Sequence, residues 1–184
     1  MASIFQMNKS TAQFIVFIVL FLAFHPAQAS CPSWPTTDRY ALKGDEVTDK
    51  QSGLIWQRCS VGQSWSPVAN TCTGNATLFT YEEALVLAKT FNSQKVSINP
   101  GQVDPRWRMP NVRELARLVD RGCEIPSIDL VAFPATAKGW FWTGSVYVSY
   151  PTFAWVVYFN TERVNSGGGR RDRAYWVRLV RNGP

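Results

Sequence analysis

Hydrophobic and polar residues alternate over two short stretches near the start of the chain and predict a β-hairpin. The stretches are residues 45–50 and 54–57, and Ser52-Gly53 lies between them. Strand patterns joined by a glycine-containing turn are typical of an antiparallel hairpin. Residues 30–38 are rich in proline and threonine, and they predict an extended lead-in.

Two later stretches carry apolar residues at helical spacing. Residues 81–92 follow Thr80 and precede a turn, and Thr80 and Glu83 have the spacing of a capping box. Residues 112–119 form the second apolar stripe. Both predicted helices are amphipathic, so a sheet or a second helix must cover their apolar faces.

A short segment before the second helix combines strand and cap signals. Residues 107–109 alternate as a strand would, and Pro110 and Asn111 then start the helix, where Glu114 can close a capping box. Arg108 lies between two apolar residues. We expect it to point inward and to form a structural pair with a carboxylate, with Glu114 as the candidate.

Arginines recur at every fourth position on another face of this predicted helix. They are Arg113, Arg117 and Arg121. A solvated face explains this spacing better than a binding stripe does.

Three more strands are predicted after a proline-containing loop at residues 122–138. They cover residues 140–145, 154–159 and 174–180. The last two are nearly continuous apolar runs, which is typical of central strands buried on both faces. Residues 160–173 contain three consecutive glycines, and because glycine loses much backbone entropy in a strand, we expect a mobile loop there.

The segment that contains Trp107, Arg108, Pro110 and Glu114 carries a family resemblance. Its sequence, WRMPNVREL, is similar to the WRLP-x-x-x-EL signature of the Lcl C-terminal domain family, a bacterial extracytoplasmic domain of unknown function. The opening hairpin, the 124–134 segment and the FWTGS, AWVVYFN and YWVRLVR sequences agree, so the resemblance covers about residues 40–181. It implies an α+β, C-type lectin-like fold with two helices packed on small antiparallel sheets, long loops and two disulfides.

Residues 1–29 have the features of a signal peptide. Lys9 precedes an apolar run that is shorter than the roughly 20 residues of a membrane-spanning helix, and Ala27-Gln28-Ala29 is a small-x-small cleavage site. We therefore expect a single exported domain of residues 30–184 with no stable membrane span after cleavage. It would be periplasmic, on the cell surface or secreted. A lipoprotein attached through Cys31 is the alternative, but the preceding residues lack the aliphatic residue of a lipobox.

Four cysteines in an exported chain predict two disulfides, for which three pairings are possible. Cys59 and Cys72 bracket turn-forming residues, which favours a bond that closes one loop. Cys31 and Cys123 are then left as the second pair. The resemblance also supports the Cys59–Cys72 loop.

The only histidine, His25, lies in the predicted signal peptide. The remaining chain therefore has no imidazole for a catalytic triad, a Cys-His pair or a histidine zinc site. Several carboxylates could serve an enzyme, but no spacing singles out a pair: Asp104, Asp120, Glu124 and Asp129. We expect no catalytic residue, no metal ligand and no enzymatic activity.

The C-type lectin-like resemblance raises the question of calcium. The Glu-Pro-Asn, Gln-Pro-Asp and Trp-Asn-Asp motifs of calcium-dependent lectins are missing from the sequence. No Asp-x-Asp-x-Asp-Gly loop occurs either. We therefore expect no cofactor; calcium bound by single carboxylates is the alternative, which no motif supports.

Positions 163–181 carry six arginines and one acidic residue, Asp172. Four of the arginines fall in the expected mobile loop, close to two tyrosines in the loop at 146–153. Arginine matches sulfate and carboxylate groups with two parallel hydrogen bonds, and tyrosine suits wet, polar partners. The candidate ligand-binding residues are Arg163, Arg170, Arg171, Arg173, Tyr147 and Tyr150. A loop kept soluble by its charge is the alternative.

The other arginines of this stretch and most tryptophans are expected to be structural. Arg178 and Arg181 lie in or beside the last predicted strand. Four tryptophans in predicted strands or at a helix start are expected in the core: Trp107, Trp142, Trp155 and Trp176.

These features favour a non-catalytic binding or adhesion module for an anionic polysaccharide or matrix glycan, sulfated or uronic. In an exported protein, a net charge of +6 points to acidic glycans rather than to nucleic acid. The adhesin that gives the resembled family its name binds sulfated glycans, which agrees with this expectation. The alternative is a structural or protein–protein interaction subunit of the cell envelope.

Overall fold

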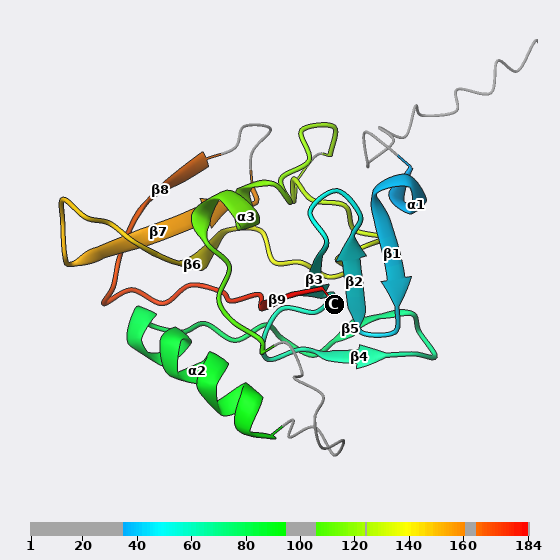
Figure 1. Cartoon of the computed structure of the whole chain (residues 1–184), viewed down its shortest axis with the longest axis horizontal. Helices are drawn as coiled ribbons and strands as arrows, with labels where there is room; N and C mark the ends of the chain where they lie inside the picture. Colours follow the sequence, from blue (N-terminus) through cyan, green and yellow to red (C-terminus); the bar gives the residue numbers. More distant parts are fainter. Residues whose placement is uncertain (1–34, 95–105, 124, 161–164, 184) are drawn as a thin grey trace, which may run out of the picture.

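The structure is a computed structural model that describes residues 35–94, 106–123, 125–160 and 165–183. These residues form an α+β domain with small antiparallel sheets and few helices. Figure 1 shows a four-stranded sheet at one end of the molecule and a three-stranded sheet at the other. The predicted signal peptide, Cys31 and Arg163 lie outside the described residues.

The four-stranded sheet joins the two ends of the domain. Its antiparallel order is β1-β2-β3-β9. The strands are β1 Tyr40–Lys43, β2 Glu46–Asp49, β3 Leu54–Gln57 and β9 Val180–Asn182. The predicted β2–β3 hairpin is confirmed. Gly53 lies in its turn and takes a φ of 71°, in the left-handed region that favours glycine. Strand β1 was not predicted, and the expected extended lead-in is wrong at its end, where α1 Thr36–Arg39 forms one helical turn.

The loop closed by Cys59 and Cys72 is confirmed by an S–S bond of 2.15 Å. It contains the two-stranded sheet of β4 Ser64–Ser66 and β5 Thr71–Thr73. Cys123 is also disulfide-bonded. Since Cys31 lies outside the described residues, the Cys31–Cys123 pairing stays a prediction.

Both main helices begin where the cap signals placed them. Helix α2 covers Tyr81–Gln94, and the Glu83 carboxylate accepts hydrogen bonds from both the N–H and the hydroxyl of Thr80. Helix α3 covers only Val112–Ala116, because i→i−3 hydrogen bonds tighten its end. Arg121 lies beyond the helix, so the three arginines do not share one helix face, but Arg113, Arg117 and Arg121 are all exposed, as expected of solvated side chains.

The segment before α3 is held by the predicted arginine–carboxylate pair. Arg108 Nη1 and Nη2 each donate to a Glu114 oxygen at 2.8 Å, and the Asn111 N–H donates to Glu114 at 2.7 Å. Trp107 is buried as expected. The pair is confirmed, but the inward orientation is only partly right, because the Arg108 side chain is 39% exposed. The predicted strand is a single bridge, from Arg108 to Val180.

The three-stranded sheet corrects the expected mobile loop. Strand β8, Asn165–Arg170, pairs in register with β7, Phe153–Tyr158, which pairs with β6, Trp140–Val146. Two of the three consecutive glycines of β8, Gly168 and Gly169, are explained by their neighbours. A Cβ on Gly169 would lie 2.8 Å from both Tyr175 and Val156 side-chain atoms, so a larger residue would displace core packing.

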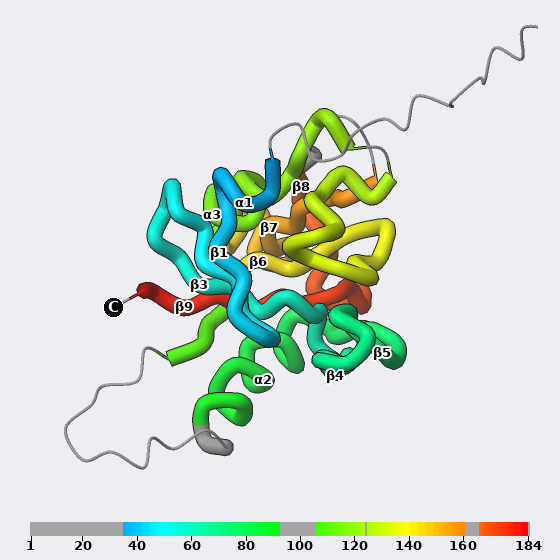
Figure 2. Tube along the Cα trace, turned by 90° about the vertical axis from the view of Figure 1, so that its right-hand side faces the viewer, coloured from blue at the N-terminus to red at the C-terminus, as the bar shows by residue number. Residues whose placement is uncertain are grey.

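The apolar segment at 174–180 is buried only over residues 177–180, and because Trp176 is half-buried, its expected place in the core is only partly right. The segment pairs with several partners instead of one strand. The N–H groups of Tyr175 and Trp176 donate to Phe79 and Trp140 on opposite sides, and the Val180 N–H donates to Arg108. Figures 1 and 2 both show this segment, in red, passing between α2 and the three-stranded sheet. Its residues contribute to both hydrophobic clusters of the core: Val180 to one, and Val177 and Leu179 to the other.

Arg178 lies in this segment and is completely buried. Its Nη1 donates to the backbone oxygens of Gln57 and Arg58, and its Nη2 donates to the hydroxyls of Ser60 and Thr136. Burial lowers the pKa of Arg178 to about 9, which leaves the guanidinium charged at neutral pH. The expected structural role is confirmed, as it is for Arg181, which pairs with Glu46 at 2.7 Å.

The glycine triplet yields a test of the corrected strand. Gly169→Ala should lower the free energy of unfolding by about 1–3 kcal/mol, because the added methyl group overpacks the site. Gly167→Ala is the matched control, since its Cβ would meet nothing within 4 Å. Urea unfolding measures both variants. Equal stability of Gly169→Ala and the wild type would contradict the β7–β8 packing.

The Arg108–Glu114 pair should make the stability of the protein depend on pH. Burial raises the pKa of Glu114, but hydrogen bonds from Arg108 and Asn111 lower it by more, so its net pKa is below the ordinary value. A carboxyl with a lowered folded pKa stabilises the protein above its unfolded pKa of about 4.3, and this contribution is lost as pH falls through the folded pKa.

Glu114→Ala should therefore destabilise the protein by about 1–2 kcal/mol at pH 7 through loss of the cap and the half-exposed pair. The difference from the wild type should shrink as the pH falls below about 4. Chemical unfolding at several pH values measures it. Arg113→Ala, on the exposed face of the same helix, is the control. A difference that does not change with pH would show that Glu114 acts without its charge.

Candidate functional site

An aromatic surface pocket lies at the end of the molecule that carries the β6–β7 connection. Tyr147, Tyr150, Phe153 and Gly168 line this pocket of about 260 Å³, which we call the aromatic pocket. Tyr150 is 59% exposed. Its ring centre lies 5.8 Å from that of Tyr147 and 6.1 Å from that of Phe153. The two predicted tyrosines are thus brought together, and exposure of Tyr150 is confirmed.

Strand register explains why these residues meet. Phe153 is paired with Arg170 and Trp155 with Gly168, and directly paired residues of antiparallel strands lie on the same face of the sheet. Tyr147 packs over this face, with its ring 4.8 Å from that of Trp155. Trp155 is only half-buried, so its expected place in the core is only partly right.

Gly168 forms the part of the pocket contributed by β8. A Cβ at this position would lie 3.2 Å from Phe153 and 3.4 Å from Tyr147. The absence of a side chain therefore keeps the space between the rings accessible. This differs from Gly169, where the missing side chain makes room for core residues on the other face.

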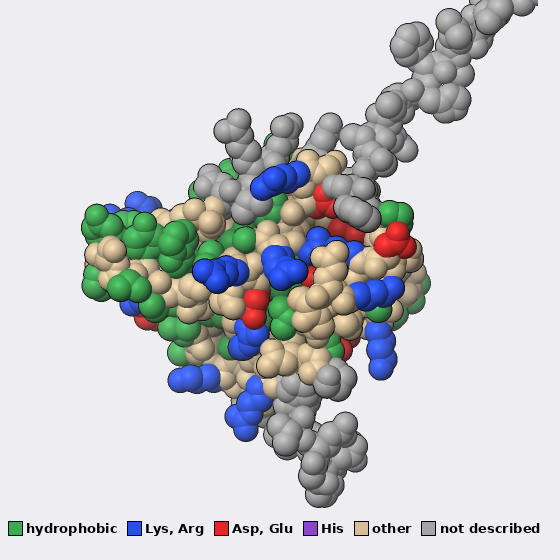
Figure 3. Space-filling model, turned by 45° about the horizontal axis from the view of Figure 1, so that its top comes forward, with side chains coloured by type: hydrophobic (Ala, Val, Ile, Leu, Met, Phe, Trp, Pro, Cys, Tyr) green, Lys and Arg blue, Asp and Glu red, His purple; other side chains and the backbone are tan. Residues whose placement is uncertain are grey.

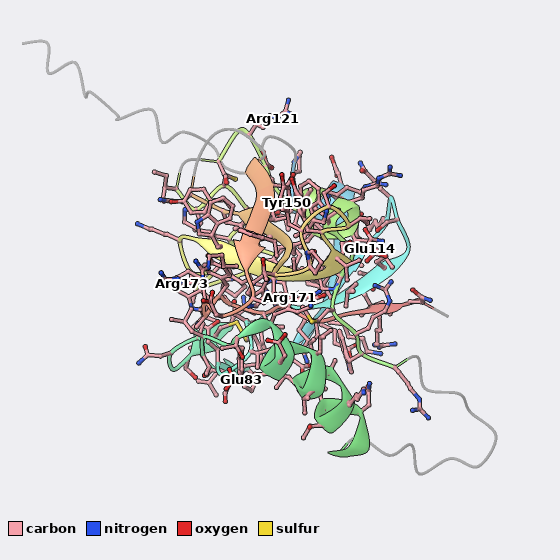
Figure 4. All side chains as sticks on the ribbon, turned by 90° about the vertical axis from the view of Figure 1, so that its left-hand side faces the viewer. Glu83, Glu114, Arg121, Tyr150, Arg171 and Arg173 are labelled. Atoms are coloured by element: carbon pink, nitrogen blue, oxygen red, sulfur yellow. A yellow bond between two sulfur atoms is a disulfide. The ribbon has the colours of Figure 1, made fainter. Side chains whose placement is uncertain are left out.

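A second pocket, of about 410 Å³, adjoins the same strand ends. We call it the polar pocket because most of its lining residues are polar or charged. It is lined by Glu82, Pro151, Thr152, Arg170, Arg171 and Asp172. Backbone hydrogen bonds hold the linings of the two pockets next to each other. The Arg171 N–H donates to the Thr152 carbonyl oxygen, and the Phe153 N–H donates to the Tyr150 carbonyl oxygen. Figure 4 looks at this end of the molecule and shows Tyr150, Arg171 and Arg173 on it.

The three described arginines of the candidate set are in different environments. Arg170 makes a two-point pair with Asp172, with N···O distances of 3.1 and 2.6 Å, and both side chains are about 60% exposed. The hydrogen bond from Arg170 lowers the pKa of Asp172. Arg173 is exposed, and its N–H closes the turn onto the Arg170 carbonyl oxygen.

Arg171 has a structural position that the sequence did not reveal. Its guanidinium lies over the ring of buried Tyr81, at 4.7 Å. Its carbonyl oxygen accepts a hydrogen bond from the Tyr81 N–H, which joins β8 to the start of α2. Arg170 and Arg173 are therefore the better probes of charge at the site.

Two pocket residues, Phe153 and Gly168, were missed at the level of sequence. Tyr147, Tyr150 and Phe153 recur every third residue around a proline, and this spacing was the available signal for Phe153. The signal for Gly168 was the glycine triplet itself, which can mark a close approach of side chains to a strand as well as a mobile loop.

Apolar side chains extend the aromatic surface beyond the pocket. Val146 is 54% exposed and Val148 is 89% exposed. Figure 3 shows hydrophobic side chains gathered at this end of the molecule, with arginine and lysine side chains nearby. The end of the β6–β7 hairpin is thus an apolar surface beside basic residues.

The described carboxylates among the four candidates stabilise local turns. Asp120 and Asp129 each accept backbone N–H groups of their own turns. Asp104 and Glu124 lie outside the described residues. Within those residues, no group of three or more histidines, cysteines, aspartates and glutamates could hold a metal ion.

The fold and the site together define a small disulfide-linked α+β domain that presents an aromatic and basic surface. The sequence profile of the Lcl C-terminal domain family matches residues 45–181, and the chain belongs to this family. No curated protein and no solved structure matches the chain. Over the described residues, the helices are too short or too polar to cross a membrane.

Proposed function

We propose that this protein is an exported, non-catalytic binding module for anionic glycans, and that its ligand lies across the aromatic pocket and Arg170 and Arg173. The observation that carries the proposal is the register of β7 and β8, which puts Arg170 directly beside Phe153. A ring-binding surface and a sulfate- or carboxylate-binding group are thus adjacent on one face.

The two halves of this surface suit two parts of an acidic sugar. Aromatic rings offer an apolar face to ring C–H groups, and tyrosine hydroxyls can meet the surrounding hydroxyl groups. Arginine binds sulfate or carboxylate groups through two parallel hydrogen bonds. Because an exposed ion pair contributes little to stability, a ligand can replace Asp172 on Arg170 at small cost.

The proposal includes a C-type lectin-like fold and export to an oxidising compartment. Pairing of β9 with β3 brings the C-terminal strand to the N-terminal hairpin, as the lectin-like fold requires. The Cys59–Cys72 bond agrees with export, since disulfides persist in oxidising compartments. No calcium requirement is part of the proposal.

Exposed Val146 and Val148 favour one alternative, an interaction subunit of the cell envelope. A protein partner would bury these side chains together with the aromatic pocket. Such binding would depend less on salt than glycan binding through arginines does. Ionic strength therefore separates the two functions.

The double variant Arg170→Ala/Arg173→Ala should lose retention on immobilised heparin, because its binding surface loses both exposed charges. Arg113→Ala/Arg121→Ala is the control, which removes the same net charge elsewhere (Figure 4 shows Arg121 away from Arg173). Elution salt and melting temperature are measured for each protein. Unchanged retention of the first variant, or equal loss in both, would overturn the arginine site.

Asp172→Asn should have the opposite effect. Removing the carboxylate frees Arg170 and raises the local positive potential, so elution from heparin should shift to higher salt. Glu82→Gln changes charge equally in the same polar pocket, without an ion pair to Arg170, and should shift elution less. If Asp172→Asn elutes earlier than the wild type, Asp172 assists the site instead of competing for Arg170.

A further inference from the structure

We propose that the aromatic pocket is the subsite for a single pyranose ring of the anionic glycan, and that Gly168 is the specificity-determining residue that keeps it open. This inference rests on the proposed function. It specifies which uncharged part of the ligand the protein recognises.

The size of the pocket limits the occupant. Sites that enclose a drug-sized ligand have volumes of about 300–1,000 Å³. At about 260 Å³, the aromatic pocket has room for one ring rather than for an oligosaccharide. Neighbouring sugars of a chain would lie outside it, along the polar pocket.

The arrangement of the rings offers a sugar ring an apolar wall on which to stack. The Tyr147 and Tyr150 planes are tilted by 37°, and the Tyr150 and Phe153 planes meet at 72°. The space between them is therefore a corner with apolar walls, not a parallel slot. A pyranose ring has apolar C–H faces and a polar rim, so it can stack one face on one wall while the hydroxyl groups of its rim stay in water.

Gly168 decides whether the ring can reach the bottom of the corner. A single Cβ would lie 3.2 Å from Phe153, which is tighter than ordinary contact, and 3.4 Å from Tyr147, and a larger side chain would fill the space between the two rings. Gly167 is in the same strand and pairs with Val156, where an added Cβ meets nothing within 4 Å. The chain thus supplies its own matched control.

Charge complementarity selects an acidic sugar as the occupant. Arg170 lies beside Phe153 in the strand register, and Arg173 follows in the turn. An apolar side chain of a protein partner could fill the corner, but it would leave these arginines without a ligand group. A sugar ring that carries a sulfate or carboxylate group, or that is linked to a ring that does, would fill the aromatic pocket and also bind the arginines.

The experiment compares Gly168→Val with Gly167→Val in binding a sulfated heparin tetrasaccharide at two salt concentrations. Gly168→Val should weaken binding about tenfold or more, which corresponds to loss of roughly 55 Å² of apolar contact. The dependence of affinity on salt should stay that of the wild type, because the arginines are unchanged. Gly167→Val should bind within about twofold of the wild type, and inorganic sulfate should compete poorly, because it has no ring.

Tyr150→Ala gives a second test that does not depend on the strand tolerating valine. Tyr150 is largely exposed, so its loss should weaken tetrasaccharide binding and leave the melting temperature unchanged. Val148→Ala, in the same loop and more exposed, is the control.

The outcomes separate this inference from the proposed function. If Gly168→Val and Tyr150→Ala bind like the wild type while Arg170→Ala/Arg173→Ala does not, glycan binding stands and the ring subsite is overturned. If the wild type binds no tetrasaccharide at either salt concentration, both proposals fail. Loss of binding in Gly168→Val and Tyr150→Ala with an unchanged salt dependence supports the subsite.

Discussion

The buried guanidinium of Arg178 is the constraint on which the arrangement of this domain depends. A charge removed from water is very costly unless hydrogen bonds replace the lost hydration. Arg178 obtains them from three separate parts of the chain: the end of β3 at Gln57, the start of the disulfide loop at Ser60 and the long loop at Thr136. These parts must therefore converge on the C-terminal segment. Arg58 extends the network, because its guanidinium donates to Gly44, Val131 and Ala132 and lies 4.0 Å from the ring centre of Trp65. Two buried arginines thus place a loop that has little regular structure of its own.

The same network explains which parts of the fold could be predicted from the sequence. The β2–β3 hairpin, the capping boxes and the Arg108–Glu114 pair depend on residues close together in sequence, and each was predicted. Strand β8 was not, because the reason for Gly169 lies in Tyr175, Trp142 and Val156, whose positions only the folded chain reveals. The backbone-entropy argument for a loop was physically sound. It was outweighed because β8 pairs with β7 along its whole length, from Asn165 to Arg170, and because aromatic packing requires small residues there.

The candidate site was predictable in its chemistry but not in its division of roles. Composition identified arginine and tyrosine correctly as the residues brought to one end of the molecule. It could not distinguish Arg171, which lies over Tyr81 and joins β8 to α2, from Arg170 and Arg173 at the surface. It also could not place Phe153 and Gly168 in the pocket, because their meeting depends on the β7–β8 register. A shift of one residue would move Gly168 to the other face of the sheet and close the pocket.

Replacing the expected mobile loop by a paired strand changes the physical basis of the proposed binding. A mobile arginine loop would lose conformational entropy on ordering around a ligand, and this cost would offset part of each contact. Arg170 and Gly168 instead lie on a strand whose backbone is held by β7, and β7 is held by β6 and covered by α3. Only side chains, such as Tyr150 and Arg170, need to become ordered. The buried network at Arg178 and the exposed aromatic pocket are in this way connected. The network fixes the segment that follows β8, and a fixed β8 keeps the aromatic pocket and Arg170 at a constant separation.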